Sequence, residues 1–306
     1  MDKQSSRAAA FRTIGFVGLG TMGRRIAARL LSAGYEVHGY NRTPERATEL
    51  VAQGLVLHDR PRDAAVRADV LFTMVADTEA LLAVAHGSVG ILAGLRPDAV
   101  WVDMSTVDLA QSRQLAERVA ALGATLLDAP VSGSVPEAET GTLAMFVGGD
   151  DDAYERALPV LTQIASSITH VGGIGDGLAL KIAMNISLAV QALALGEGVL
   201  LAESSGIEPS RAMDAMLATG VSSPMLRARI PLSGDRAEEP WFTVEQMQND
   251  LRLALELGRD LEVPLPTTAL TNEIFSAARA QGRRGEDVIA VVDVLAQLAG
   301  RDRGAT

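Results

Sequence analysis

The sequence predicts an α/β fold, a doubly wound parallel sheet followed by an all-helical C-terminal domain. Short apolar runs rich in β-forming residues alternate with amphipathic stretches of helical period through the first half of the chain. A glycine-rich turn joins the first run to the first helix, and no convincing strand follows Gly177. Strands that alternate with helices form parallel sheets covered on both faces, so the two halves of the chain should differ in architecture.

The strands of the first half are expected in short apolar runs. The helix after the first run has apolar positions at helical spacing and ends at Gly34, and the next helix begins with Thr43 as a cap and Pro44 in its first position. The expected strand runs are TIGFVGLG (13–20), EVHGYNR (36–42), ADVLFTMVAD (68–77), DAVWVDMST (98–106), ATLLDAPVSG (124–133), TLAMFVGG (142–149) and SITHVGG (167–173).

Long helical stretches make up the second half. The first is about 28 residues long, which corresponds to about 42 Å at 1.5 Å per residue. A helix this long and this apolar must be covered by other helices, either of the same chain or of a second subunit. The expected helices are 178–205, 209–219, 243–261, 267–281 and 286–299.

A glycine cluster at 172–177 marks the expected domain boundary. We expect a sheet domain at 12–174 and a helical domain at 175–300. A disordered segment at 1–11 and a tail at 301–306 should flank them. The length of 306 residues fits one large or two medium-sized domains.

Composition and charge exclude several classes of function. The net charge of −11 argues against a nucleic-acid partner, which needs clustered Lys and Arg. The absence of cysteine excludes disulfides, thiolate nucleophiles and zinc–thiolate sites, and the four histidines are too scattered for a metal site. The uncharged run 182–196 is too short to cross a membrane, and no signal-like apolar segment precedes the first strand, so the cytoplasm is the expected compartment.

The turn GLGTMG has the pattern of a dinucleotide-binding loop. Gly18 allows the tight turn, Gly20 lets the backbone approach a pyrophosphate, and Gly23 lets the helix pack on the strand. The N-terminus of the helix then faces the phosphates with its partial positive charge. Because the motif follows a strand and opens a helix, a Rossmann-type cofactor loop is favoured over a glycine-rich turn without a ligand. The loop also contains Leu19, Thr21 and Met22.

The end of the second expected strand distinguishes NAD from NADP. An acidic residue there would bind the ribose 2′-hydroxyl, but this chain has Asn41, Arg42 and Thr43. The guanidinium and hydroxyl can hold a 2′-phosphate, which a carboxylate would repel. The pattern therefore favours NADP, the alternative being that Arg42 is only a solvated loop residue.

One lysine stands in the otherwise apolar start of the long helix. Lys181 and Asn185 are four residues apart and share one helix face. Lys181 is either a snorkelling lysine whose head reaches water or a general acid placed where a dinucleotide would lie. In the second case partial desolvation would lower its pKa toward the operating pH, and Asn185 would orient the substrate or the ammonium. Spacing alone leaves the two readings even.

A Ser-Gly-Ser turn follows another expected strand. Ser132, Gly133 and Ser134 lie on the side of the sheet where α/β proteins bind ligands. Their backbone N–H groups and hydroxyls can form an anion-binding concavity, although Ser-Gly-Ser is also common in plain turns.

Four motifs resemble the β-hydroxyacid dehydrogenase family over residues 12 to 298: GFVGLGTMG, DAPVSGS, GLALKIAMN and FTVEQMQNDLRLALE. The third is the most specific, because it matches the family's catalytic lysine and asparagine at Lys181 and Asn185. The forms SGS and NRT are most similar to the NADPH-dependent glyoxylate/succinic semialdehyde reductase branch.

The resemblance implies the roles of further residues. Ser132 and Gly133 would bind the substrate carboxylate with Ser134, and Thr106 would lie near both nicotinamide and substrate. Phe242 and Asp250 match positions that close the site from the helical domain. The residues implied to line the cofactor are Met74, Val75 and Ala76.

The resemblance also implies the activity. A hydride would pass between nicotinamide and the carbonyl carbon of a small anionic aldehyde or ketone, while Lys181 protonates the oxygen, in a homodimer or homotetramer. One departure is Asn249, which replaces the family's usual lysine near the cofactor. Imine reductases and a non-catalytic NADPH-binding protein are the alternatives, and Lys181 favours carbonyl chemistry. 6-Phosphogluconate dehydrogenase has a similar lysine–asparagine pair but a much longer helical domain.

Overall fold

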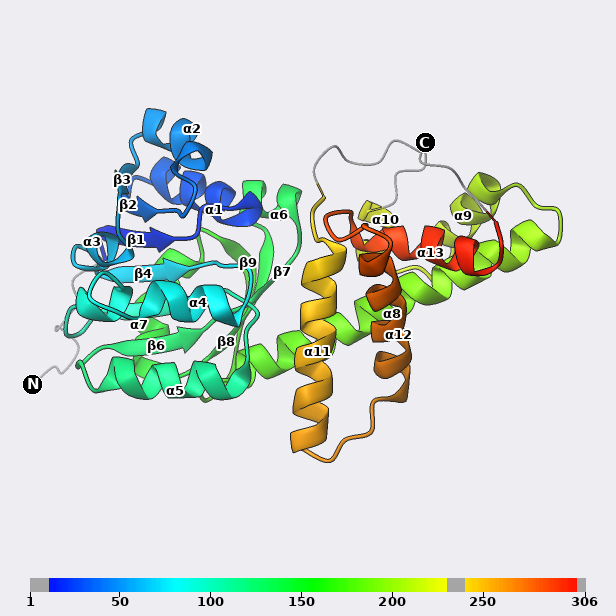
Figure 1. Ribbon diagram of the computed structural model, residues 1–306. Coiled ribbons are helices and arrows are strands. Elements are labelled where there is room, and N and C mark those ends of the chain that lie inside the picture. The colour runs from blue at the N-terminus through cyan, green and yellow to red at the C-terminus, as the bar shows by residue number, and fades with distance from the viewer. Residues whose placement is uncertain (1–10, 230–239, 302–306) are drawn as a thin grey trace, which may run out of the picture. The chain divides into compact units, whose positions relative to one another are not determined.

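The computed structural model describes residues 11–229 and 240–301 and divides into two compact units, Met1–Lys181 and Ile182–Thr306 (Figure 1). We refer to these as unit 1 and unit 2. The division falls within the long helix α8 (Asp176–Ser204), a little beyond the boundary expected between 174 and 175. The disordered segment expected at 1–11 and the tail expected at 301–306 lie almost entirely outside the described residues.

Unit 1 contains one sheet in the order β3-β2-β1-β4-β5-β6-β8-β7, with β9 paired to β8. The expected α/β architecture, a Rossmann-type sheet followed by a helical domain, is confirmed (Figure 1). The strands are β1 (Thr13–Val17), β2 (Glu36–Tyr40), β3 (Val56–His58), β4 (Val70–Thr73), β5 (Val100–Asp103), β6 (Thr125–Asp128), β7 (Val131–Ser132), β8 (Leu143–Gly148) and β9 (Ala165–Gly172).

The sheet is mixed rather than wholly parallel. The six neighbouring strands β3, β2, β1, β4, β5 and β6 run parallel to one another. In contrast, β8 runs antiparallel to both β6 and β7. The run 124–133, expected as one strand, is split into β6 and β7 at Pro130, because proline has no N–H group to donate to a ladder. The chain then returns through a short helix to β8, which produces the antiparallel pairing.

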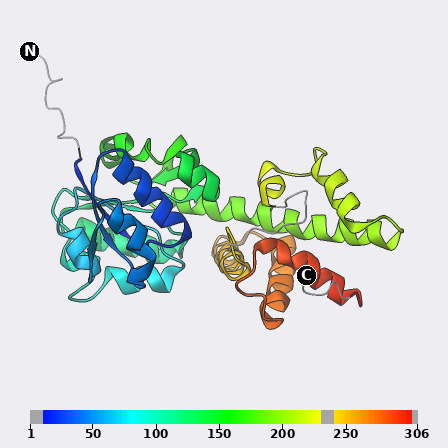
Figure 2. The ribbon, with the colours of Figure 1, turned by 90° about the horizontal axis from the view of Figure 1, so that it is seen from above.

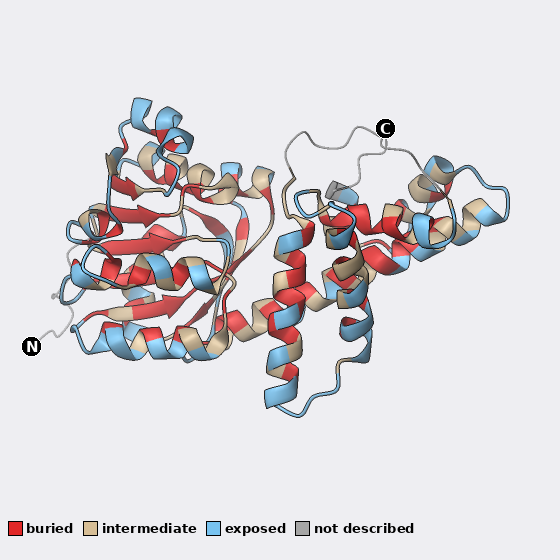
Figure 3. Ribbon diagram, in the orientation of Figure 1, coloured by how far each residue is buried: buried red, intermediate tan, exposed pale blue. Residues whose placement is uncertain are grey.

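Helices cover both faces of the sheet. Apolar side chains of α1, α2, α6 and α7 share one core cluster with alternate strand residues such as Phe16 and Phe72. The cyan helices α4 and α5 lie on the opposite side (Figure 2), and the strands between the layers are buried (Figure 3). The helices are α1 (Thr21–Ser32), α2 (Thr48–Ala52), α3 (Pro61–Ala65), α4 (Thr78–Ala85), α5 (Leu109–Ala120), α6 (Val135–Thr140) and α7 (Asp151–Leu161), with 3-10 turns at Pro44–Ala47 and Ile91–Ala93.

Unit 2 is helical, as expected. Its core joins α8 to the helices that follow, through buried residues such as Ala192, Leu251 and Phe275. The short helix α10 was not expected from the sequence. Besides the rest of α8, unit 2 contains α9 (Pro209–Leu217), α10 (Pro224–Arg229), α11 (Val244–Asp260), α12 (Pro266–Ala280), a 3-10 turn (Val288–Ala290) and α13 (Val291–Leu298).

The length and composition of α8 as a whole, rather than of the uncharged run 182–196, would suffice to cross a membrane. The core helix of a globular protein passes the same test. In α8 the residues Ala189, Ala192, Leu195 and Val199 are buried in the core of unit 2, so this helix has the packing of a core helix.

Candidate active site

The glycine loop between β1 and α1 is shaped by close backbone contacts. Gly18 has φ +101°, and a Cβ there would lie 2.2 Å from the carbonyl oxygen of Met74. A Cβ at Gly23 would lie 2.0 Å from the carbonyl oxygen of Gly18, so this glycine allows the helix to close on the loop itself. At Gly20 a Cβ would meet no atom within 4 Å. Two glycines are therefore required by packing, while the third leaves open space where a ligand can approach the backbone.

Hydrogen bonds tie this loop to the segment after β2. The N–H of Gly18 donates to the carbonyl of Tyr40 at 2.9 Å, and the N–H of Leu19 donates to Oδ1 of Asn41, also at 2.9 Å. The amide nitrogen of Asn41 donates to the carbonyl of Thr43 at 2.8 Å. The side chain of Asn41 therefore connects the glycine loop to the turn that contains Arg42 through hydrogen bonds.

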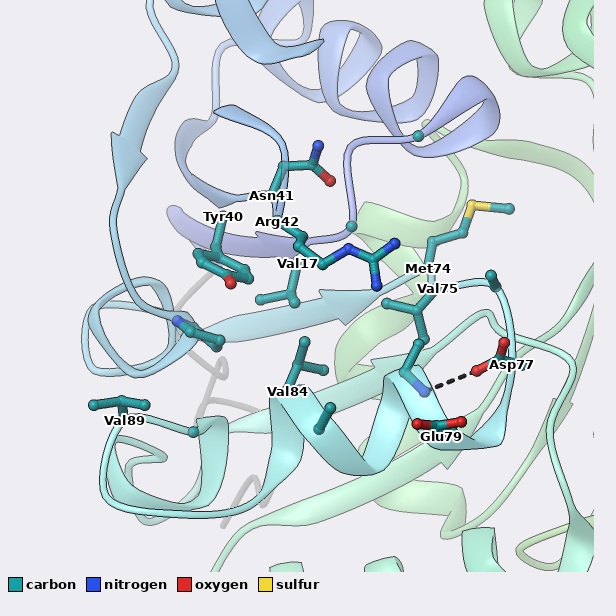
Figure 4. A pocket seen from close by; sticks show the side chains of 17 residues that line it. Val17, Tyr40, Asn41, Arg42, Met74, Val75, Asp77, Glu79, Val84 and Val89 are labelled. Carbon is teal, nitrogen blue, oxygen red and sulfur yellow. Dashed lines mark hydrogen bonds between the residues drawn. The ribbon is translucent and has the colours of Figure 1, made fainter. Parts of the chain in front are cut away.

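A cavity of about 490 Å³ opens where β1, β2 and β4 end (Figure 4). In parallel α/β sheets this carboxyl edge is where ligands bind. The cavity is lined by Val17, Gly18, Gly20, Tyr40, Asn41, Arg42, Pro61, Met74, Val75, Ala76, Asp77, Glu79, Ala80, Ala83, Val84, Val89 and Gly90.

Arg42 is the one cation among these lining residues. Its side chain extends across the cavity in the direction of Val75 (Figure 4). Within the described residues its guanidinium makes no hydrogen bond or ion pair, so its donors are available to a ligand. The first turn of α1 begins after Gly20 without a side-chain cap, and its N–H groups provide a second set of donors.

The cavity does not contain every residue expected at the cofactor. Leu19 points into the core of the sheet and contributes only its N–H to the loop. The expected residues outside the lining are Leu19, Thr21, Met22, Gly23, Thr43 and Thr106.

One wall of the cavity is formed by α4, which was not predicted from the sequence. Asp77 caps this helix by accepting the N–H of Ala80 at 2.8 Å, and Ala80, Ala83 and Val84 form its cavity face. The signal was present in the sequence, since an Asp cap followed by small residues at helical spacing comes directly after an expected strand. The other missed lining residues are Val17, Tyr40, Pro61, Glu79, Val89 and Gly90.

A buried carboxyl group supports the loop after β4. Oδ1 of Asp103 accepts hydrogen bonds from the hydroxyls of Thr73 and Ser105, both at 2.7 Å. Oγ of Ser105 in turn accepts the N–H of Val75 at 3.0 Å, and Trp101 donates to Thr73 at 2.8 Å. Through Ser105, Asp103 therefore holds the backbone of a residue that lines the cavity.

Burial raises the pKa of Asp103 to about 6, against the hydrogen bonds from Thr73 and Ser105, which lower it. A carboxyl whose folded-state pKa exceeds its unfolded value stabilises the fold most at low pH, and that contribution is lost as pH rises through the folded-state pKa. Between pH 4 and pH 7, we expect the stability of Asp103→Asn relative to wild type to rise by about 2 kcal/mol. Urea unfolding at several pH values measures this difference, and a difference that stays flat or falls with pH would contradict it.

Some hydrogen-bond donors of the Ser-Gly-Ser turn are already bound to the carboxylate of Glu137. Gly133 has φ +131°, and Ser134 begins α6. Both the N–H and the hydroxyl of Ser134 donate to Oε2 of Glu137, at 2.8 and 2.9 Å, in a capping box. These Ser134 groups, expected to bind a substrate anion, are thus committed to Glu137, and Ser132 and Gly133 remain as the candidate donors of this turn.

Asp128, the last residue of β6, holds the start of α8. Its two carboxylate oxygens accept the N–H groups of Gly175 and Leu178, each at 2.6 Å. Lys181 follows Leu178 by one turn and is half-buried. Unit 1 therefore contains the cavity at the ends of β1, β2 and β4, the Ser-Gly-Ser turn at the end of β7, and Lys181 on a helix whose start is held by the end of β6.

The remaining predicted site residues lie in unit 2. Asn185 is buried, and its amide nitrogen donates to Oδ2 of Asp250 on α11 at 2.5 Å. Its amide oxygen is therefore the atom that can accept a further hydrogen bond. Phe242 packs against the core of unit 2. Beside Asp250, the amide nitrogen of Asn249 is buried and has no hydrogen-bond partner among the described residues.

Residues 11–229 and 240–301 contain no group of three or more His, Asp or Glu side chains that could hold an ion.

Two family models together match nearly the whole described chain. The model described as the NAD binding domain of 6-phosphogluconate dehydrogenase matches residues 13–172. The model described as the NAD-binding domain of NADP-dependent 3-hydroxyisobutyrate dehydrogenase matches residues 175–295. The gap between the two matches coincides with the glycine cluster that the sequence indicated as a boundary.

Individual relatives agree with these matches. Glyoxylate/succinic semialdehyde reductase 2 of Arabidopsis thaliana is 32% identical over 95% of this chain and 81% of its own length. 2-Hydroxy-3-oxopropionate reductase of Escherichia coli is 35% identical over 94% of this chain and 98% of its own. The structure of Mycobacterium tuberculosis 3-hydroxyisobutyrate dehydrogenase with L-serine superimposes with a TM-score of 0.81 at 31% identity, over 93% of this chain and 99% of that one.

The expected family is confirmed by these matches, which also agree with the glycine loop, the mixed sheet and the helical second unit. The chain belongs to the β-hydroxyacid dehydrogenase family and is an NAD(P)-dependent oxidoreductase that acts on CH–OH groups.

Proposed function

We propose that this protein is an NADPH-dependent reductase that converts a small anionic aldehyde or ketone into the corresponding hydroxy acid, with Lys181 as general acid. The observation that carries the proposal is the arrangement of unit 1. The cavity that contains Arg42 lies at the carboxyl edge of the sheet, and Lys181 lies on a helix anchored to the end of β6 at the same edge.

The residues present fit a dinucleotide. Gly20 leaves its backbone open to a pyrophosphate, and the uncapped first turn of α1 offers N–H donors to its charge. Arg42 can bind a 2′-phosphate through charge-assisted hydrogen bonds, and no carboxylate stands beside it at the end of β2. When bound, the nicotinamide supplies the hydride.

The chain's own groups would bind and protonate the substrate. Ser132 and Gly133 offer donors to a substrate carboxylate, while Lys181 gives its proton to the carbonyl oxygen as that oxygen gains negative charge. Lys181 is half-buried. The family resemblance predicts that Asn185 is catalytic together with Lys181 and that Thr106, Phe242 and Asp250 bind the substrate, and these assignments are part of the proposal.

We further propose that the protein acts as a homodimer or homotetramer. Large apolar side chains of unit 2, in its helices and in the turns between them, are more than half exposed in the single chain. A second copy would remove such surface from water. The exposed side chains include Leu201, Val221, Leu261, Leu270 and Leu298. Light scattering after size exclusion measures the state, and a monomer at micromolar concentration would contradict the proposal.

The function is tested by steady-state oxidation of NADPH and NADH against a panel of small aldehydes. The panel pairs each carboxylate-bearing aldehyde with a neutral aldehyde of the same size and includes imines as an alternative class. We expect turnover with NADPH and an anionic aldehyde, and weaker turnover with the neutral partner. Activity restricted to imines, or no activity with any carbonyl compound, would overturn the proposal.

Glu137 allows a separate test of the Ser-Gly-Ser turn. Glu137→Ala frees the N–H and hydroxyl of Ser134, so KM for an anionic aldehyde should fall by about fivefold while the lost cap costs about 1 kcal/mol of stability. The matched control is Glu139→Gln, which removes an exposed carboxylate of the same helix. An equal change in KM for a neutral aldehyde of the same size would show that the turn does not bind the carboxylate.

A further inference from the structure

The carboxylate of Asp128 is buried and fully committed to the start of one helix. Asp128 ends β6 and is 2% exposed. Oδ1 accepts the N–H of Gly175 and Oδ2 accepts the N–H of Leu178, both at 2.6 Å, across 47 and 50 residues of sequence. Both oxygens therefore accept hydrogen bonds from the same short segment of backbone, 175–178. The two contacts fix the orientation of this segment as well as its distance from the sheet.

Two glycines close around this carboxylate. A Cβ at Gly148 would lie 2.5 Å from Oδ1 of Asp128. A Cβ at Gly177 would lie 2.3 Å from the carbonyl oxygen of Phe146 and 3.0 Å from Oδ2 of Asp128. The end of β8 and the first turn of α8 thus approach so closely that only glycine fits at either point, and the helix start has little room to shift.

Ordinary capping does not explain this arrangement. Asp150 caps α7 by accepting one N–H, from Ala153 at 2.9 Å, and it is exposed to solvent. Burying a carboxylate costs free energy even when it is hydrogen-bonded. Burial raises the pKa of Asp128, against the hydrogen bonds from Gly175 and Leu178 that lower it. An exposed cap would stabilise a helix at a lower cost in free energy. We therefore interpret the buried carboxylate of Asp128 as a group that fixes the position of the start of α8.

The helix that Asp128 holds carries the proposed general acid. Leu178, whose N–H the carboxylate accepts, precedes Lys181 by three residues, or about 4.5 Å along the helix axis. Within the first turns of a helix this separation is rigid, so a shift or rotation of the start moves the Lys181 side chain with it. A proton donor misplaced by about 1 Å can lose about 100-fold in rate.

We propose that Asp128 is a positioning residue that sets the place of Lys181 through the first turn of α8. The inference rests on the proposed function, in which Lys181 protonates the substrate.

The test begins with Asp128→Asn, which keeps one acceptor and turns the other position into a donor that opposes a backbone N–H. We expect kcat to fall about 10- to 100-fold, while the dissociation constant of NADPH stays within about twofold. Amide hydrogen exchange in 175–181 should become faster. The matched control is Asp150→Asn. It weakens the cap of α7, a helix of the same unit that does not carry Lys181, and should leave kcat unchanged.

A double-mutant cycle separates positioning from general damage to the fold. If Asp128 acts through Lys181, Asp128→Asn should change the residual turnover of Lys181→Ala by no more than about twofold. An undiminished effect of Asp128→Asn in that background overturns the inference, as does full turnover in Asp128→Asn with faster exchange at 175–181. If Lys181→Ala itself keeps full turnover, the proposed function fails, and the positioning of a general acid fails with it.

A second variant covers the case in which Asp128→Asn does not fold. Gly177→Ala leaves the carboxylate in place, but its methyl group would push the helix start away from Phe146 and β8. The same fall in kcat, again absent in the Lys181→Ala background, is expected. Unchanged kcat in a folded Gly177→Ala protein whose amides at 175–181 exchange faster would overturn the inference.

Discussion

Replacement of Lys181 by alanine is expected to lower kcat by about 10²- to 10⁴-fold, the usual contribution of a general acid. Without the ammonium, the oxygen of the substrate gains negative charge with no positioned proton donor. The affinity for NADPH should stay within about twofold, because the cavity residues that would bind the cofactor lie on other elements of unit 1. Steady-state rates combined with fluorescence titration of NADPH measure the two quantities.

The control for this prediction is Lys181→Arg. Arginine keeps the positive charge and much of the side-chain volume, but its guanidinium does not release a proton at neutral pH. We therefore expect little recovery of kcat in this variant. Recovery to wild-type rates would mean that position 181 supplies charge rather than a proton, and equal losses of turnover and NADPH affinity in Lys181→Ala would mean that the residue is structural.

Arg42→Asp is expected to weaken NADPH binding by about 10- to 100-fold, which corresponds to the loss of hydrogen bonds between charged groups. The new carboxylate would repel the 2′-phosphate and could accept a hydrogen bond from the ribose 2′-hydroxyl of NADH. Binding of NADH should therefore be unchanged or stronger. The ratio of kcat/KM for the two cofactors, measured with one aldehyde, gives the shift in preference.

The matched control for net charge is Arg67→Asp. Arg67 is an exposed arginine of unit 1 that does not line the cavity. The same charge change at this position should leave the cofactor ratio within about twofold, because charges exposed to solvent are screened over about 8–10 Å. An equal shift in both variants would attribute the preference to the overall field of the protein, and no shift in Arg42→Asp would remove the assignment of the NRT turn.

Much of the fold could be predicted because its signals are local. The glycine loop, the helix that ends at Gly34 and the apolar strand runs each depend on a few neighbouring residues. The errors have physical reasons too. β3 has only three residues and no clear period, Pro130 splits one expected strand in two, and the antiparallel pairing of β8 depends on where the chain returns to the sheet.

The candidate site was predicted less completely. The NRT turn indicated Arg42, and the structure places this residue in the cavity beside Gly18 and Gly20. The roles of Asp103, Asp128 and Glu137 were not predicted. No pattern in one strand shows which distant N–H or hydroxyl group a carboxylate will accept.

By itself, the sequence determined the two architectures and the glycine loop, since each follows from residue type and spacing over a few turns or strand positions. It also led to two predictions about function, Arg42 from the NRT turn and Lys181 from the family resemblance. Only the tertiary structure decided which donors are free and which carboxylates are buried. The N–H of Ser134 donates a hydrogen bond to Glu137, and the carboxylate of Asp128 accepts one from the N–H of Gly175, which is 47 residues away in the sequence. Such contacts depend on how strand ends and helix starts meet in space, and burial and hydrogen bonding at those meeting points set both the charge state and the position of each group.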